Sequence, residues 1–343
     1  MQAWAWLQKK VRMPNILVFC GGGIGDVMMT TPMLRAIKTS WPDATLSVAV
    51  RQTVAIQLLE DNPFVDELLD MNEYTFIQLV RAVKSRGFAY CFHNHSCQSI
   101  VFYAVPFLSR IPVRIGFNRY LIKSTWINRL KPLLLTERLT YVPDAELRSS
   151  MNLKLLAFVD IVSDTTDYDL FIEDKSVQTN VVGIHPGCDK NGSIKRWPIK
   201  RFVELAERIG ETGASVVFFI GPAEAEMLPQ IRTSEFVSVS KPKSLKDLIC
   251  QMSTCRVFIA NDNGPAHLAA ALKVPTMVIY GPTRKTEFVL PTRYIGIEPI
   301  GYDCTKCFRE KECYNHSACL NSISVSEVMN QYMGLSTRLK EED

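Results

Sequence analysis

The chain has 343 residues, of which 47% are hydrophobic and 22% charged, a composition typical of a globular protein large enough for two domains. No apolar run approaches the roughly 18 residues needed to cross a bilayer, and residues 1–13 lack the apolar core of a secretory signal. We therefore expect a cytoplasmic protein whose 10 cysteines are reduced or bind metal. The net charge of +4 is too small to indicate nucleic-acid binding.

The first half of the chain alternates short hydrophobic segments with segments of helical spacing. Strands are predicted at 15–20, 46–50, 67–69 and 88–92, and helices at 27–40, 74–85, 96–108 and 144–162, the last with Asp144 as its N-cap. The polar stretch 163–180 then separates this half from the next. It is the best candidate for a domain boundary.

The second half starts the same alternation again. Strands are predicted at 181–184, 215–220, 237–239, 256–260 and 276–280, and helices at 199–211, 224–230, 244–252 and 265–272. Repeated strand–helix units predict parallel sheets covered by helices, so we expect two Rossmann-like α/β domains, 1–170 and 171–343. Because ligands bind at the carboxyl ends of such strands, we expect an active site in a cleft between the domains.

The first predicted strand runs into a glycine-rich loop, residues 21–25, which is followed by Asp26. A dinucleotide-binding loop requires the spacing G-x-G-x-x-G, but Asp26 occupies its last position. The second strand also ends in Arg51 instead of the acidic residue that would bind a ribose, so the loop disfavours NAD. Asp26 either caps the helix that follows or, kept ionised at the helix start, accepts a proton from an incoming hydroxyl.

Segments that follow strands in the second half carry phosphate-binding chemistry. Lys195, with Trp197 packed beneath it, is expected to neutralise a phosphate. Asn263 and Gly264 stand at a helix start, where backbone N–H groups form an anion site. Glu224 follows the strand 215–220, where a carboxylate can bind ribose hydroxyls.

Each of these residues also has an ordinary structural interpretation. Lys195 is then a surface cation, Asn263 a helix cap and Glu224 a first-turn residue. His267, near a helix start, is then a hydrogen-bonded structural histidine. Because all of them lie at strand ends of one domain, together they favour a ligand that carries a diphosphate.

A basic segment lies in the first half, with a single anion, Glu137, between residues 101 and 140. Its cations are Arg110, Arg114, Arg119, Lys123, Arg129, Lys131 and Arg138. This excess either attracts an anionic substrate or membrane headgroups, or is a solvated basic face.

Four motifs in this order closely resemble family 9 glycosyltransferases, the bacterial lipopolysaccharide heptosyltransferases: GGGIGDVMMTTPMLRAIK, HPGCDKNGSIKRWP, FFIGPAEAEM and NDNGPAHLAAALKVPTMVIYGPT. The resemblance covers residues 15–335. It implies the GT-B fold, two Rossmann-like domains of which the first binds mainly the acceptor and the second mainly the nucleotide-sugar. It also implies an inverting reaction, usually without a catalytic metal, with ADP-heptose as the typical donor.

Carried over by position, the resemblance implies that Asp26 is the catalytic base and that Lys195 contacts the donor phosphates. The donor-binding residues that it implies are Gly25, Glu224, Lys243, Asp262, Asn263, Gly264 and His267. The match at Glu224 is loose because Glu226 is nearby. The chain also departs from the family between Gly187 and Lys195, which leaves the phosphate contacts of that segment open.

The function implied is transfer of a heptose to the anionic inner core of lipopolysaccharide, without a required cofactor. A peripheral contact with the inner membrane through Trp4, Trp6 and the basic residues beside them is a further expectation. The alternatives are transfer of another nucleotide-activated sugar to a surface glycan, a nucleotide-sugar epimerase, and a nucleotide-sugar-binding protein without catalytic activity.

Near the C-terminus, four cysteines follow one another at short spacings: Cys304, Cys307, Cys313 and Cys319, with His316 among them. Such a cluster resembles a structural zinc or iron–sulfur site. Reduced structural thiols and an oxidised pair are the alternatives.

Overall fold

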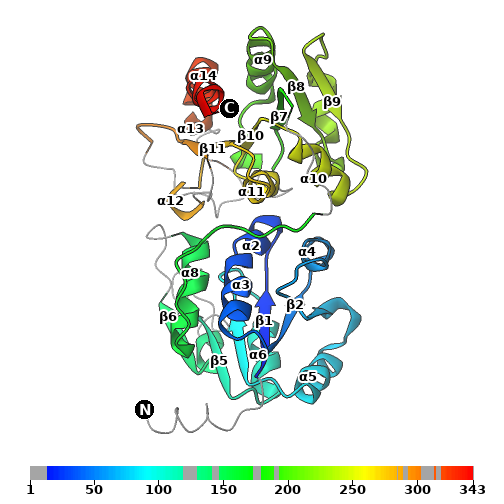
Figure 1. The fold of residues 1–343 in the computed structure, drawn as a ribbon, viewed down its shortest axis with the longest axis vertical. Helices are drawn as coiled ribbons and strands as arrows, with labels where there is room; N and C mark the ends of the chain where they lie inside the picture. Colours follow the sequence, from blue (N-terminus) through cyan, green and yellow to red (C-terminus); the bar gives the residue numbers. More distant parts are fainter. Residues whose placement is uncertain are drawn as a thin grey trace. The chain divides into compact units, whose positions relative to one another are not determined.

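The computed structural model describes residues 14–118, 130–140, 147–172, 179–188, 193–283, 285–288, 293–302, 313 and 318–342. The chain forms two compact units, Met1–Phe171 and Ile172–Asp343. Each is built on a parallel sheet of six described strands (Figure 1).

The sheet of the first unit has the strand order β3-β2-β1-β4-β5-β6, and every neighbouring pair is parallel. Its strands are β1 (Asn15–Cys20), β2 (Thr45–Val50), β3 (Glu67–Asp70), β4 (Tyr90–His93), β5 (Val113–Asn118) and β6 (Glu137–Thr140). This is the order of a doubly wound Rossmann fold. From β1 the chain continues toward one edge of the sheet, and from β4 it continues toward the other.

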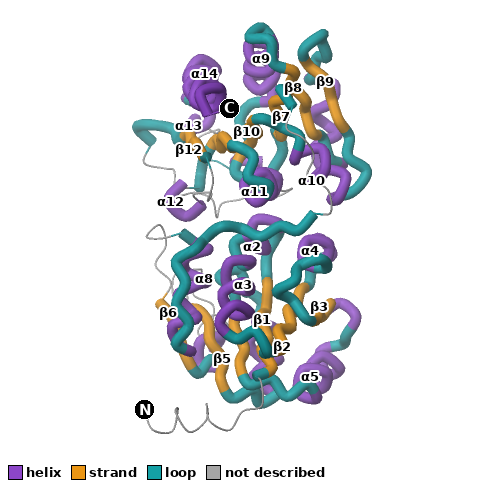
Figure 2. The backbone as a smooth tube through the Cα atoms, viewed as in Figure 1, coloured by secondary structure: helices purple, strands orange, loops and turns teal. Residues whose placement is uncertain are grey.

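Helices cover both faces of this sheet. The described ones are α2 (Ile24–Met28), α3 (Thr31–Ser40), α4 (Thr53–Leu59), α5 (Phe76–Ser85), α6 (Ile100–Leu108) and α8 (Arg148–Lys154), with short 3₁₀ turns η1 (Met71–Glu73), η2 (Lys131–Leu134) and η3 (Leu155–Val159). Leu17 and Phe19 of β1 pack in one hydrophobic cluster with side chains of α5 and α6. On the opposite face, α3 packs against α8, and Figure 2 shows both in front of the strands.

Two of the helices predicted in the first half are divided in the structure, and the helix predicted at 224–230 is a 3₁₀ helix. The predicted helix 27–40 is divided into α2 and α3 because Pro32 begins a new helix at its first turn, while the Thr30 hydroxyl donates to the Asp26 carbonyl at 2.7 Å. The predicted helix 144–162 is observed as α8 and η3, and its predicted cap, Asp144, lies outside the described residues.

The second sheet repeats the strand order of the first, β9-β8-β7-β10-β11-β12, again with parallel neighbours throughout. Its strands are β7 (Val181–His185), β8 (Ser215–Phe219), β9 (Val237–Ser240), β10 (Val257–Asn261), β11 (Thr276–Ile279) and β12 (Tyr294–Ile297). The central strands β10 and β11 are buried along their whole length. This is expected of parallel strands covered on both faces.

The described helices of the second unit are α9 (Ile199–Gly210), α10 (Leu245–Ser253), α11 (Gly264–Ala271), α12 (Lys285–Phe288), α13 (Ala318–Ser322) and α14 (Val325–Glu342), with 3₁₀ turns η4 (Ser193–Lys195) and η5 (Pro222–Gln230). Helices α9 and α14 pack against each other, and both contribute to one hydrophobic core. Two doubly wound sheets confirm the predicted α/β class and the two Rossmann-like domains.

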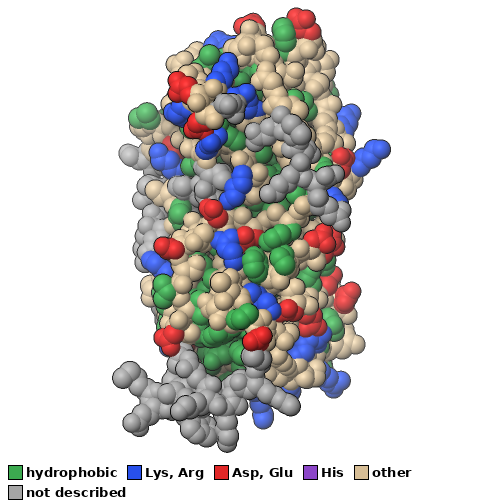
Figure 3. All heavy atoms as spheres, viewed as in Figure 1, with side chains coloured by type: hydrophobic (Ala, Val, Ile, Leu, Met, Phe, Trp, Pro, Cys, Tyr) green, Lys and Arg blue, Asp and Glu red, His purple; other side chains and the backbone are tan. Residues whose placement is uncertain are grey.

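On the face drawn in Figure 3, charged side chains of both signs are interspersed with hydrophobic ones in each unit. Positive charge is therefore not gathered into one field on that face. Among the residues that the structure describes, no helix combines the length and the apolar character needed to cross a bilayer.

Candidate active site

In the first unit, the loops after β1 and β4 lie side by side at the carboxyl edge of the sheet. Strands β1 and β4 are parallel neighbours, and the chain leaves them in opposite directions. This is the switch point at which doubly wound sheets bind ligands. The loop after β1 carries Asp26, and the loop after β4 carries Asn94, His95 and Ser96.

Two glycines allow these loops to approach. A Cβ atom on Gly21 would lie 2.8 Å from the backbone oxygen of Ser96. Gly22 has φ of +92°, and a Cβ there would lie 2.1 Å from Oδ2 of Asp26. Glycines at these positions therefore allow the Asp26 carboxylate to lie against the backbone of the turn.

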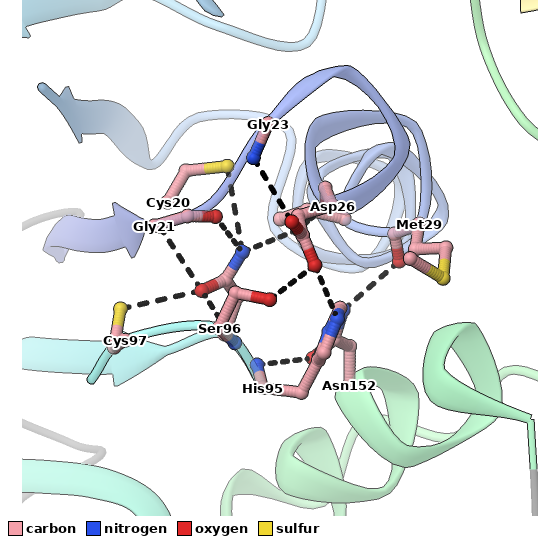
Figure 4. A network of polar contacts seen from close by, with 11 residues as sticks. Cys20, Gly21, Gly23, Asp26, Met29, His95, Ser96, Cys97 and Asn152 are labelled. Carbon is pink, nitrogen blue, oxygen red and sulfur yellow. Dashed lines mark hydrogen bonds and ion pairs between the residues drawn. The ribbon is translucent and has the colours of Figure 1, made fainter. Parts of the chain in front are cut away.

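Both oxygens of Asp26 accept hydrogen bonds (Figure 4). Oδ1 accepts from His95 Nε2 at 2.9 Å and from the Ser96 hydroxyl. Oδ2 accepts from the backbone N–H of Gly23 at 2.9 Å. The side chain of Asp26 keeps 23% of its surface exposed, whereas that of His95 is fully buried. Hydrogen bonds therefore hold the carboxylate on one side, and its exposed side is accessible to a ligand.

A second layer of amides fixes these loops. Asn94 accepts from the backbone N–H of Gly21 at 3.1 Å and donates to the Gly21 carbonyl at 3.1 Å, which ties the two loops together. Asn152 of α8 accepts from the backbone N–H of His95 at 2.9 Å and donates to the Met29 carbonyl at 2.9 Å. Both asparagines are buried, so their hydrogen bonds are costly to break.

These contacts decide the charge of Asp26. Burial by itself opposes ionisation. The hydrogen bonds from His95 and Ser96, with the charge of His95, outweigh burial and hold the pKa of the Asp26 carboxyl well below its usual range. Arg148, the first residue of α8, adds a further positive charge that lowers this pKa. Asp26 is therefore ionised at neutral pH.

The second unit has an equivalent switch point between β7 and β10. Asn263, the N-cap of α11, accepts from the backbone N–H of Ala266 at 3.0 Å, so its amide nitrogen points back to the loop after β7. There it donates to the Gly187 carbonyl at 2.8 Å and contacts Nδ1 of His185 at 3.0 Å. The predicted cap role of Asn263 is confirmed, and the first turn of α11 is fixed at the strand ends.

Lys195 and Asp262 form an ion pair at this edge, 2.8 Å apart, in which Asp262 is buried and Lys195 is partly exposed. The Thr283 hydroxyl, after β11, donates to the same carboxylate oxygen at 2.7 Å. Burial raises the pKa of Asp262, but the charge and hydrogen bond of Lys195 outweigh it and lower that pKa. Trp197 anchors the segment, because its ring is buried and its indole N–H donates to the Ile323 carbonyl at 3.0 Å.

Glu224, at the start of η5, is buried against Gly187, where a Cβ atom would lie 2.3 Å from its carboxylate. Burial raises the pKa of Glu224. Its oxygen lies 3.9 Å from Nε2 of His185, whose own pKa burial lowers to about 4. These two residues therefore do not form an ion pair at neutral pH. Glu226 instead pairs with Arg196 at 2.8 Å.

The structure thus brings together Lys195, Glu224, Asp262 and Asn263, with Gly264 beginning α11. His267 is buried on α11, and its charge contributes to the lowered pKa of Asp262. Two other predicted donor residues lie elsewhere. Lys243 is exposed beyond β9, the edge strand, and Gly25 lies beside Asp26 in α2.

The described cations of the basic segment lie in different places. Lys131 donates to the Gln98 carbonyl, in the loop after β4 at the edge that carries Asp26. Arg110 and Arg114 stand before and at the start of β5, at the amino edge of the sheet, opposite the edge that carries Asp26. Arg114 donates to the backbone carbonyls of Ile111 and Leu134. The remaining member described is Arg138, because Arg119, Lys123 and Arg129 lie outside the described residues.

Cys313 and Cys319 are described, whereas Cys304, Cys307 and His316 are not. Within the described ranges, no group of three or more His, Cys, Asp or Glu side chains could hold a metal ion. The structural metal therefore stays a prediction.

Sequence reasoning missed His95, Ser96 and Arg148, which act on Asp26, and Asn152, which holds His95. A signal was available for the first two, since they follow directly after the predicted strand 88–92. Polar residues after a strand next to β1 are expected at the switch point.

A model of glycosyltransferase family 9 (heptosyltransferase) matches residues 142–318, just over half of the chain. Lipooligosaccharide heptosyltransferase 2 of Campylobacter jejuni is 28% identical over 163 residues, 45% of this chain and 50% of that relative. The chain therefore spans about half the length of this relative. Lipopolysaccharide heptosyltransferase 2 of Escherichia coli is 25% identical over 301 residues, 78% of this chain and 83% of that protein.

Among solved structures, that of E. coli ADP-heptose lps heptosyltransferase II has a TM-score of 0.74 at 21% identity, covering 96% of this chain and 99% of that one. This likeness confirms the GT-B fold class. Together with the family match, it shows that the chain belongs to glycosyltransferase family 9, the heptosyltransferase family.

Proposed function

We propose that this protein is an inverting glycosyltransferase that moves a heptose from ADP-heptose to a lipopolysaccharide inner-core acceptor, with Asp26 as general base. The observation that carries the proposal is the ionised, partly open carboxylate at the switch point of the first sheet. The E. coli and C. jejuni relatives, whose names specify heptosyltransferases, support the choice of sugar.

In the proposed reaction, an acceptor hydroxyl approaches Asp26 and gives it a proton while the acceptor oxygen bonds to the anomeric carbon. The bond from that carbon to the diphosphate oxygen breaks on the opposite face, so the configuration is inverted. Because the lowered pKa makes Asp26 a weak base, we expect proton transfer to accompany bond formation, when the hydroxyl has become acidic.

The leaving diphosphate needs positive charge and hydrogen-bond donors, which the second unit supplies. Lys195 is fixed by Asp262 at the strand edge, and the backbone N–H groups at the start of α11 lie close by in the fold. We propose that Asp262 positions the lysine and does not bind phosphate itself, because two anions would repel. Glu224 is proposed to accept from the donor ribose. No catalytic cofactor is part of this proposal.

The acceptor is proposed to be an anionic glycolipid, with Arg148 of α8 as a further positive charge that acts on Asp26. We further propose a cytoplasmic enzyme that contacts the inner membrane peripherally. Phe107 and Leu108, both about half exposed, adjoin Arg110 and Arg114, which is the combination that binds an anionic bilayer. Sedimentation with vesicles that contain anionic lipid tests the contact, and Phe107→Ser with Leu108→Ser should abolish it. The predicted Trp4 and Trp6 contact lies outside the described residues.

The function is tested by a thermal-shift screen of nucleotide-sugars, followed by donor-release assays with lipopolysaccharide core acceptors. We expect ADP-heptose to raise the melting temperature most and ADP to be released only when an acceptor is present. Turnover of the donor without acceptor would favour an epimerase. Binding without turnover under any acceptor would favour a nucleotide-sugar-binding protein, and a higher shift with another donor would change the sugar transferred.

The cysteine cluster carries a separate proposal, a structural metal held by Cys304, Cys307, Cys313 and Cys319. Metal analysis of protein purified without chelator should find about one metal equivalent, or one cluster, per chain. If no metal is found and the thiols of these four cysteines can all be titrated, reduced structural cysteines are favoured.

A further inference from the structure

His95 lies between the Asp26 carboxylate and the amide of Asn152, and its side chain is fully buried. Figure 4 shows its ring pointing from the loop after β4 toward both partners. Nε2 is 2.9 Å from Oδ1 of Asp26, and Nδ1 is 3.3 Å from Oδ1 of Asn152. Each ring nitrogen therefore faces an oxygen.

The orientation of the Asn152 amide is fixed by the main chain. The backbone N–H of His95 requires an acceptor and the Met29 carbonyl requires a donor. Only one orientation of the amide satisfies both, and it turns Oδ1 toward Nδ1 of His95. The oxygen at that position is thus imposed by two backbone groups.

A neutral imidazole carries one N–H and can donate to only one of these two oxygens. The imidazolium carries two and donates to both, and it lies beside an ionised carboxylate. The two oxygens together with the negative charge of Asp26 therefore favour the charged ring. His93 also faces two oxygens but no carboxylate, and burial lowers its pKa. Asp26 and His95 then form an ion pair of zero net charge in the first switch point.

This arrangement also distinguishes the two carboxylate oxygens. Oδ1 accepts from both His95 and Ser96, which occupies its two lone pairs. Among the residues that the structure describes, Oδ2 accepts only the backbone N–H of Gly23, so one lone pair remains. A hydroxyl that approaches the exposed side of Asp26 finds its acceptor on Oδ2.

We propose that His95 is a positioning residue of the transfer reaction: as the imidazolium it holds Oδ1 of Asp26, so that Oδ2 receives the proton of the acceptor hydroxyl. This rests on the proposed function, in which Asp26 is the base. The proton passes from the acceptor oxygen to Oδ2 as that oxygen bonds to the anomeric carbon and the diphosphate leaves. His95 keeps both of its ring protons throughout.

The consequence is a pH profile that depends on His95. Among the described residues, the ionisable groups that face Asp26 are His95 from the loop after β4, Arg148 from α8 and the buried Cys20 thiol at the end of β1. Without the charge of His95, less positive charge opposes the effect of burial, which raises the pKa of Asp26. The acid limb of kcat should therefore move to higher pH.

The test compares His95→Gln with the wild type and with His93→Gln. Glutamine keeps a donor near the position of Nε2 but carries no charge. His93 is a matched control because it is also buried, two residues away, and contacts the backbone carbonyls of Ile115 and Phe102 instead of Asp26. Rates of heptose transfer are measured from pH 4 to pH 8 at saturating substrates.

For His95→Gln we expect kcat at pH 7 to fall about 10- to 100-fold and the acid limb, which in the wild type lies below the measured range, to move up into that range. His93→Gln should lower the melting temperature without moving the acid limb. An unmoved acid limb in a folded His95→Gln protein would overturn the inference.

Asp26→Asn separates this inference from the proposed function. If Asp26→Asn keeps wild-type turnover, the proposed function is wrong. If it is inactive while His95→Gln keeps the wild-type pH profile, only the role of His95 is wrong. Should His95→Gln fail to fold, ¹⁵N NMR of the histidine rings in the wild-type protein decides: both nitrogens of His95 should be protonated at pH 7, and a ring with one bare nitrogen contradicts the inference.

Discussion

The two units share a strand order and a switch point, but their loops carry opposite chemistry. In the first unit, the loop after β1 presents a carboxylate, Asp26. In the second, the loop after β7 leads to a lysine, and the loop after β10 opens a helix whose N–H groups face the same edge. The fold therefore determines where a ligand binds, whereas the loops determine which ligand it is.

The buried histidines of the two switch points, His95 and His185, also differ in what their ring nitrogens face. His95 faces oxygens with both nitrogens, which favours the charged ring. His185 faces the amide nitrogen of Asn263, a donor, so its Nδ1 must be an unprotonated acceptor. The first switch point therefore favours a positive ring beside the Asp26 carboxylate, whereas the second keeps its histidine neutral, and its positive charge is that of Lys195.

The largest effect is expected from Asp26→Asn, which removes the base and leaves the second unit untouched. We expect kcat to fall about 1,000-fold or more, with donor affinity nearly unchanged. Transfer rates and donor titrations measure the two quantities. Asp43→Asn, an exposed carboxylate ahead of β2, is the matched control and should retain activity. A parallel loss of donor affinity would contradict the proposal that the first unit supplies the base and the second unit binds the donor.

Lys195→Met tests the proposed role of the second unit. It removes the cation for the diphosphate, so kcat should fall about 100-fold or more and, unlike with Asp26→Asn, donor affinity should fall as well. It also leaves Asp262 buried without its ion-pair partner, which should destabilise the unit by about 3 kcal/mol. Lys200→Met, an exposed lysine on α9, is the control. Unchanged donor affinity with Lys195→Met would contradict the assignment.

The features that could be predicted from the sequence are those encoded locally. A strand, a glycine loop and Asp26 are consecutive in the chain, as are the strand, Asn263 and the helix that it caps. Their spacing is therefore readable without knowledge of the fold. The contacts to His95 and Asn152 are not, because 69 residues separate His95 from Asp26 and another 57 separate it from Asn152.

Charge counted along the chain does not show which cations lie near Asp26, for the same reason. Arg110 and Arg114 are near one another in sequence, but only the sheet shows that they stand at the amino edge, away from Asp26. Arg148, which does act on Asp26, lies outside the basic segment. The edge strand β6 was also missed because it is short and half exposed, without the hydrophobic run that identifies β1.

Gly187→Ala tests how closely the second switch point is packed. The new Cβ would lie 2.3 Å from the Glu224 side chain, so the carboxylate must move. We expect a loss of up to about 3 kcal/mol in unfolding free energy and weaker donor binding. Gly334→Ala is a matched control in α14, where no atom lies within 4 Å of the added Cβ, and it should be neutral or stabilising. Equal stability of the two variants would show that Glu224 is free to move.

A smaller effect, expected only in acid, comes from the neutral state of His185. Burial lowers its pKa from the usual 6.5 to about 4, so as the pH falls the unfolded chain binds the proton first and stability is lost between about pH 6.5 and pH 4. His185→Asn keeps an acceptor for Asn263 but does not titrate. Urea unfolding at pH 7 and pH 5 should therefore show the wild type losing about 2 kcal/mol more than the variant. Glu224, whose raised pKa acts in the opposite direction, is present in both proteins and cancels in the difference. An equal loss in the two proteins would mean that folding does not lower the pKa of His185, and the contrast between the two histidines would disappear.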